Sequence, residues 1–246
     1  MNICCNLRTL TAFVLALFLC VPAQFAKGAD GQCAVSQEMA ERVRESAADQ
    51  VEAILSRLAL ACDAGFPLAS FEGKVAEGLA KGVPSSVIVT TLDRKLDAFG
   101  HAATMLRQCG LAARPDALAA LGAGLFDGVP DVTLNGYVCA YADRKPGPFL
   151  WGLEMLCFLS RAGFDDMLSR SVLDAGFEAG SLTREWRYFV RVVLAARQRG
   201  VSDSAVADAA RAVLRGHGSP SDVSARLGFT DRDLTGRGLP GRSSGN

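Results

Sequence analysis

Hydrophobic positions recur at three- and four-residue steps along most of this chain, which is the spacing of one face of an α-helix. The first such stripe runs from Met39 to Leu58. Ser36 precedes it as a favourable N-cap, and Gly65 followed by Pro67 is typical of a helix end. The pattern therefore predicts one long helix from Ser36 to Gly65.

The same spacing predicts helices along the rest of the chain. The β-branched run 87–91 has strand propensity, but its apolar positions continue a helical stripe as far as Gly110, so a helix is expected there too. Two prolines flank a glycine at Pro146-Gly-Pro148, which predicts a firm break. Further helices are expected over about 68–81, 87–110, 116–125, 132–141, 149–159, 167–177, 186–200, 202–213 and 219–228.

A glycine-containing phrase is repeated along these helices. Shorter glycine pairs precede the copies, at Gly65-Phe66, Gly110-Leu111, Gly163-Phe164 and Gly200-Val201. Recurrence at roughly 35–50 residues is typical of stacked copies of one supersecondary unit. The copies are Gly78-Leu-Ala-Lys-Gly82-Val-Pro84, Gly124-Leu-Phe-Asp-Gly128-Val-Pro130, a divergent Gly176-Phe-Glu-Ala-Gly180-Ser-Leu182 and a shortened Gly216-His-Gly218-Ser-Pro220.

Each full copy carries two glycines, for which different structural reasons are expected. The second glycine stands where a helix stops, so it supplies a positive φ; these are Gly82, Gly128 and Gly180. The first glycine lies inside the helix, where glycine costs about 1 kcal/mol relative to alanine; these are Gly78, Gly124 and Gly176. Because the same loss of helix stability recurs in each copy, we expect a structural advantage of glycine that recurs with it. Close approach of a neighbouring helix is the favoured explanation, and ligand contact is the alternative.

These patterns predict an all-α fold of stacked helical-hairpin repeats, a solenoid-like array, over residues 33–233. The tail 234–246 is rich in Gly, Arg, Ser and Pro and is expected to be disordered. The phrase resembles that of exported bacterial helical proteins of unknown role, which carry a Gly-Leu-x-x-Gly-Val-Pro turn between two helices. The resemblance covers about Gly65 to Gly228. It implies a fold and export, and it implies no activity.

The N-terminus has the pattern of a secretory signal peptide. Arg8 provides a positive charge, a short apolar run follows from Leu10 to Val21, and Val21-Pro-Ala23 supplies small residues for cleavage. We expect a signal peptide at 1–23, with cleavage as late as 28 as the alternative, and a periplasmic or secreted protein. A lipid anchor on Cys20 is a weaker alternative. No later segment has the 18 apolar residues of a transmembrane helix.

Five cysteines follow the expected signal peptide, and export favours disulfides among them. An odd number leaves at least one thiol unpaired within the chain. Cys139 with Cys157 is a candidate pair, because it would tie two helices across Pro146-Gly-Pro148. Cys33 with Cys62 is disfavoured, because both would lie at opposite ends of one straight helix. The sequence does not choose among the arrangements of Cys33, Cys62, Cys109, Cys139 and Cys157.

Composition and charge narrow the functional classes. The 26 basic and 26 acidic residues balance, which gives no electrostatic case for binding nucleic acid. Only two histidines, His101 and His217, are present, and no metal-ligand spacing or nucleotide-binding motif is found, so neither a metal nor a cofactor is expected.

Two groups of residues are candidates for function. Glu154 stands in an apolar run, where a buried carboxylate acts as a general acid. The alternatives are an ion pair with an arginine such as Arg187 or Arg191, or simple exposure on the polar edge of the helix. The second group combines Trp, Tyr and Arg, the residue types enriched at binding hot spots, and its alternative is a core helix with a charged outer face. It consists of Arg184, Trp186, Arg187, Tyr188 and Arg191.

The sequence favours an exported, non-catalytic binding or scaffolding protein that holds a protein or another envelope component. One alternative is an envelope enzyme that acts on peptidoglycan with Glu154 as general acid. Another is an envelope protein anchored by lipid on Cys20.

Intact mass spectrometry of the protein recovered from the envelope tests export and the cysteine pairing together. A mass that begins at Gln24 or Ala29, with one alkylated thiol in the absence of reductant, is expected for an exported protein with two disulfides. A mass that begins at Cys20 with acyl chains would instead establish a lipoprotein. Alkylation of all five later cysteines would contradict the disulfides.

Overall fold

The computed structural model describes residues 33–111 and 114–229. The expected signal peptide at 1–23, the later cleavage position at 28, Cys20 and the expected tail 234–246 lie outside these residues. So do residues 112–113 and 230–233 of the expected helical domain 33–233.

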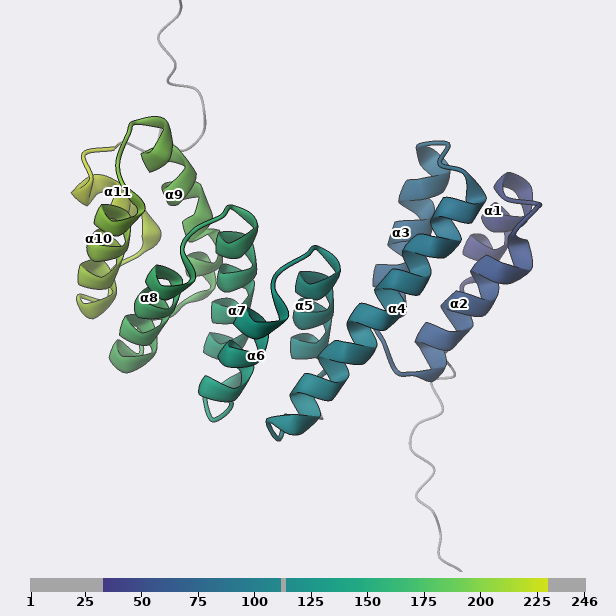
Figure 1. Ribbon diagram of the computed structural model, residues 1–246, viewed down its shortest axis with the longest axis horizontal. Helices are drawn as coiled ribbons and strands as arrows, with labels where there is room; N and C mark the ends of the chain where they lie inside the picture. Colours follow the sequence, from purple (N-terminus) through teal and green to yellow (C-terminus); the bar gives the residue numbers. More distant parts are fainter. Residues whose placement is uncertain (1–32, 112–113, 230–246) are drawn as a thin grey trace, which may run out of the picture. The chain divides into compact units, whose positions relative to one another are not determined.

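The described residues are all-helical and contain no strand, as the hydrophobic spacing predicted (Figure 1). A 3₁₀-helix, η1 (Arg184–Tyr188), precedes α9. The α-helices are α1 (Gln37–Ser46), α2 (Val51–Asp63), α3 (Leu68–Ala80), α4 (Ser85–Gln108), α5 (Pro115–Phe126), α6 (Asp131–Ala140), α7 (Pro146–Arg161), α8 (Asp166–Ala179), α9 (Phe189–Gln198), α10 (Asp203–Arg215) and α11 (Pro220–Arg226).

Most helices that follow one another in the chain pack against each other, and so do helices two elements apart in the α-helix order, such as α2 with α4, α5 with α7 and α8 with α10. Hydrogen bonds between hairpins join residues at a nearly constant separation of 32 to 36 positions. A constant separation means that equivalent positions of successive units meet, which is the contact pattern of a stacked repeat. Examples are Arg57 to Asp93, Arg114 to the Pro146 carbonyl, Thr133 to Asp166, Arg161 to Asp127 and Trp186 to the Gly218 carbonyl.

The repeated glycine phrase is a Schellman helix end. At the first copy the Val83 amide donates to the Gly78 carbonyl and the Gly82 amide donates to the Leu79 carbonyl, with Gly82 at φ +64°. Only glycine adopts this left-handed conformation without strain. The same two bonds end the helices at Gly128 and Gly180. They also end the helices at the shorter pairs that begin with Gly65, Gly110, Gly163 and Gly200, so both sequence patterns are one motif.

The glycines inside the helices lie where a neighbouring side chain comes close. A β-carbon at Gly78 would lie 2.9 Å from the Ile88 side chain, and one at Gly124 would lie 2.7 Å from Sγ of Cys157. One at Gly176 would lie 2.7 Å from Leu182. Close packing therefore offsets the low helix propensity of these positions.

The first predicted helix is wrong, because the chain forms two helices there. α1 ends at Ser46 and α2 begins at Val51. The turn between them folds the chain back, so Cys33 and Cys62 form a disulfide with Cα atoms 5.6 Å apart. The geometric objection to this pair assumed a straight helix and does not apply.

The candidate disulfide between Cys139 and Cys157 is also wrong. Cys139, near the end of α6, is bonded to Cys109 at the end of α4, with Cα atoms 5.2 Å apart. Cys157 is a free, buried thiol on α7 that packs against Gly124 of α5. Sequence spacing alone did not show that Cys139 meets α4 or that Cys157 packs against α5.

α4 contributes to both apolar cores of the described structure. Its first part packs with α1, α2 and α3, and its last part packs with the helices that follow. Phe99 ends the first part, with its ring centroid 5.1 Å from that of Phe71. A β-carbon at Gly122 of α5 would lie 2.7 Å from this ring. The absence of a side chain at Gly122 thus lets α5 approach α4 at the junction of the two cores.

None of the helices in the described ranges is long and apolar enough to cross a bilayer.

Substituting Gly122→Ala should destabilise the protein by about 2 kcal/mol, because the buried Phe99 ring has no room to move and overpacked cores typically cost this much. The matched control is Gly100→Ala, on α4, where an added β-carbon has no neighbour within 4 Å. That variant should be neutral or more stable by up to about 1 kcal/mol, since alanine has the higher helix propensity. Equal effects of the two changes in chemical denaturation would contradict the role of Gly122.

Candidate functional site

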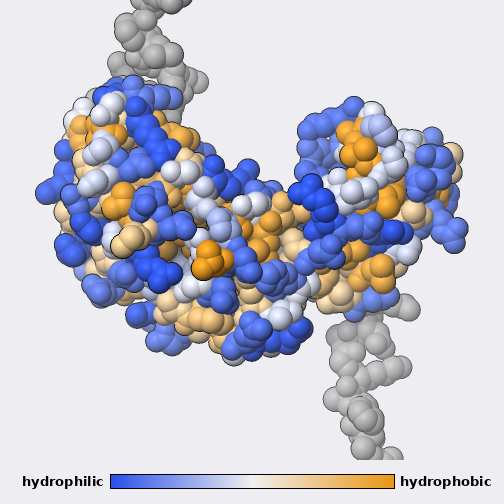
Figure 2. All heavy atoms as spheres, in the orientation of Figure 1, coloured by the Kyte–Doolittle hydropathy of each residue, from blue (hydrophilic) through white to orange (hydrophobic). Residues whose placement is uncertain are grey.

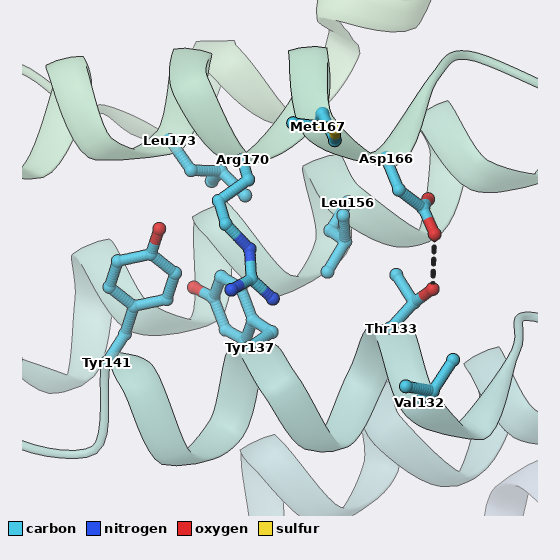
Figure 3. Close-up of a pocket in the computed structure, with 9 residues that line it drawn as sticks. All are labelled: Val132, Thr133, Tyr137, Tyr141, Leu156, Asp166, Met167, Arg170 and Leu173. Atoms are coloured by element: carbon cyan, nitrogen blue, oxygen red, sulfur yellow. Dashed lines mark hydrogen bonds between the residues drawn. The ribbon is translucent and has the colours of Figure 1, made fainter.

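A groove lies between α6 and α8, with α7 beneath it. α8 packs closely on α10 and only loosely on α6, so side chains rather than helix backbones fill the space between α6 and α8. The cavity has a volume of about 330 Å³, at the lower end of the range for small-molecule sites. Its lining residues, shown in Figure 3, are Val132, Thr133, Tyr137, Tyr141, Leu156, Asp166, Met167, Arg170 and Leu173.

Two tyrosines of α6 form much of the groove floor. Tyr137 donates a hydrogen bond of 2.6 Å to the Phe149 carbonyl of α7, and its hydroxyl passes over Gly152, where a β-carbon would lie 2.5 Å away. Tyr141 donates to Asp174 of α8 at 2.5 Å. Burial is the main cause that raises the pKa of both tyrosines above the ordinary 10.0. Both phenols therefore stay protonated and remain fixed donors.

The groove carries two opposite charges that do not pair with each other. Asp166 and Arg170 are four residues apart on α8, a spacing at which such residues commonly pair. Instead, Asp166 accepts a hydrogen bond of 2.6 Å from Thr133 of α6. Arg170 extends across the groove toward Tyr137 (Figure 3), and the structure gives its guanidinium no hydrogen bond or ion pair within the described residues.

Gly136 makes the position of Arg170 possible. A β-carbon at residue 136 would lie 2.6 Å from Nη2 of Arg170. The guanidinium therefore lies against the backbone of α6. A guanidinium that makes no other hydrogen bond keeps its donors available to a carboxylate.

Exposed apolar side chains border the groove. Val132 on α6 is 78% exposed and Met167 on α8 is 82% exposed, the highest values among the large apolar residues of the described structure. More generally, apolar residues lie among hydrophilic ones on the molecular face in Figure 2. Single exposed apolar residues are common on protein surfaces, and two of them line this groove.

The Trp, Tyr and Arg group does not form one surface. Trp186 is fully buried and donates to the Gly218 carbonyl, so it belongs to the core and not to a binding surface. Tyr188 is exposed and is flanked by Arg187 and Arg191, whose guanidinium carbons lie 4.5 and 4.7 Å from its ring centroid. Arg184 is exposed in η1. η1 and α9 replace the single helix predicted over 186–200.

Glu154 is partly buried on α7, and its Oε2 lies 3.5 Å from Nη1 of Arg187. This is the arginine partner that the sequence offered as the alternative to general-acid chemistry. Arg187 also hydrogen-bonds the Tyr188 hydroxyl. The arginine therefore links the acid of α7 to the surface tyrosine.

Burial makes the free thiol of Cys157 unreactive. It raises the pKa of this thiol to about 12, where little thiolate forms at neutral pH. Within the described ranges, no three His, Cys, Asp or Glu side chains gather in an arrangement that could hold a metal ion.

The amino-acid sequence alone does not reveal the groove. Its residues belong to three helices, and on each helix they fit the ordinary apolar stripe or the polar face. The pairing of Asp166 and Arg170 at i, i+4 was visible, but that spacing predicts an ion pair and not two separated charges.

Comparisons with protein-family models, with curated proteins and with solved structures find no match to this chain.

Lys95 is a buried ammonium group at the α3–α4 contact. Its side chain is almost enclosed, Nζ donates to the Ser70 carbonyl at 2.6 Å, and the rings of Phe71, Phe99 and Phe126 lie within 5.8 Å. Burial, followed by the charge of Lys74, lowers the pKa of Lys95 from 10.5 to about 8. The ring faces and the carbonyl favour the charged form but do not offset the loss of hydration.

This shift predicts how stability depends on pH. Between pH 8 and 10.5 the unfolded chain binds more protons at Lys95 than the folded chain, so stability should rise with pH in that window. Relative to Lys95→Met, the wild type should gain up to about 3 kcal/mol across it. Chemical denaturation at several pH values measures the difference. Parallel profiles for the two proteins would show that Lys95 titrates normally.

Proposed function

We propose that this chain is an exported, non-catalytic binding or scaffolding protein of the bacterial envelope, and that the α6–α8 groove is its binding surface. The observation that carries the proposal is the guanidinium of Arg170, which extends toward Tyr137 and has no ion pair among the described residues. Exposed Val132 and Met167 line the same groove. Fixed charges, fixed hydroxyls and accessible apolar area in one place are what recognition requires. The partner is expected to be a protein or another envelope component.

Export is supported by the two disulfides, since such bonds persist in oxidising compartments. A periplasmic or secreted location also agrees with the expected signal peptide at 1–23. The alternative of a lipid anchor on Cys20 concerns a residue outside the described ranges.

The alternative of a peptidoglycan-acting enzyme rests on Glu154 as general acid. Its contact with Arg187, at 3.5 Å, favours the alternative of a structural ion pair between α7 and η1. The groove residues are better suited to binding than Glu154 is to catalysis.

Site-specific photo-crosslinking in producing cells tests the proposal. A photoreactive residue at Val132 or at Met167 should give discrete crosslinked products, because both positions border the groove. The matched control is Leu60 on α2, which is 53% exposed and lies away from the groove. Products of equal yield at Leu60, or no product at either groove position, would contradict the assignment of the binding surface.

A further inference from the structure

We propose that the partner in the α6–α8 groove is a second copy of this chain, related by a two-fold axis, with α8 of each copy lying across the groove of the other. This inference rests on the proposed function, because it names the occupant of the same surface. It follows from the arrangement of charges and apolar residues on α8.

The charges of α8 are self-complementary. Asp166 and Arg170 leave each other unpaired and both face the groove. In a two-fold interface each residue contacts a different residue of the partner, and the reciprocal contact follows by symmetry. When two copies of α8 cross in antiparallel directions, Asp166 of each faces Arg170 of the other. The two-fold axis therefore produces two equivalent contacts between Asp166 of one copy and Arg170 of the other.

An exposed apolar residue lies beside the charged pair on α8. Met167 stands between Asp166 and Arg170 along the helix axis, and its side chain is 82% exposed. The methionine of each copy then lies near that of the other and over the partner's groove. Methionine adapts its shape to irregular surfaces, which suits a contact of this kind.

Apolar and aromatic side chains line the groove that these methionines would contact. Its walls include Leu156 of α7, Leu173 of α8 and the rings of Tyr137 and Tyr141 (Figure 3). The cavity of about 330 Å³ suits side chains better than a large cofactor. Val132 on the opposite side extends the apolar contact.

Other charges near the groove do not compete with this pairing. Asp174 is engaged by the hydroxyl of Tyr141, and Asp165 caps the start of α8 through the amides of Met167 and Leu168. Asp166 holds only the Thr133 hydroxyl, and a carboxylate has further acceptor sites for a guanidinium.

Charge reversal tests the symmetry directly. Sedimentation of the wild type at about 1 to 100 µM should show a monomer–dimer equilibrium. Asp166→Arg places two arginines opposite each other, and Arg170→Asp places two aspartates opposite each other, so each variant alone should be monomeric. An equimolar mixture of the two should dimerise again, because each arginine then faces an aspartate. The double variant, with both reversals in one chain, should also dimerise.

The control variant is Asp208→Arg on α10, which removes an exposed pairing with Arg211 and should leave dimerisation unchanged. Circular dichroism of each single variant verifies that it keeps its helix content. A wild type that stays monomeric, or single variants that dimerise as the wild type does, would overturn the proposal. So would a mixture that remains monomeric.

The crosslinks at Met167 separate this inference from the proposed function. A product with twice the mass of the chain supports the second copy. A product that contains a different protein would overturn the inference and leave the groove as a binding surface. If neither Met167 nor Val132 gave a crosslinked product, both the second copy and the binding surface would be contradicted.

Discussion

The contact between Phe99 and Gly122 joins the two apolar cores of the described structure. α4 passes from one core into the other, and Phe99 stands at the transition with its ring against Phe71. The Phe99 ring leaves no room for a side chain at the facing position of α5, and that position is Gly122. The hairpins on both sides of the junction then follow from ordinary packing of apolar faces. The low helix propensity of glycine is offset by dispersion and apolar burial at the contact.

The hairpins themselves depend on a second use of glycine. At each helix end with the Schellman pattern, two backbone bonds satisfy carbonyls that the helix leaves without partners. The turn also fixes the direction in which the chain leaves the helix. Because the same turn recurs, equivalent positions meet from one hairpin to the next, and hydrogen bonds such as Thr133 to Asp166 and Tyr141 to Asp174 span the same 33 residues.

The groove is a consequence of unequal packing between the units. α8 lies closely on α10, whereas its contact with α6 is made by side chains, above all Arg170 and the two tyrosines of the floor. Gly136 and Gly152 make room for the guanidinium and for the Tyr137 hydroxyl. Asp166 and Arg170 both reach across the gap, Asp166 to Thr133 and Arg170 to the backbone at Gly136.

The amino-acid sequence by itself determined the all-helical fold, most helix positions and the glycine turns, because these depend on spacing within one segment and on local backbone conformation. It did not determine the break after Ser46, the disulfide partners of Cys33 and Cys139, or the burial of Trp186. The two disulfides and the hydrogen bond of Trp186 join residues 29 to 32 positions apart. The α6–α8 groove was beyond its reach for the same reason. Only the tertiary structure decided which faces meet, because helical periodicity identifies an apolar face and leaves its partner undefined.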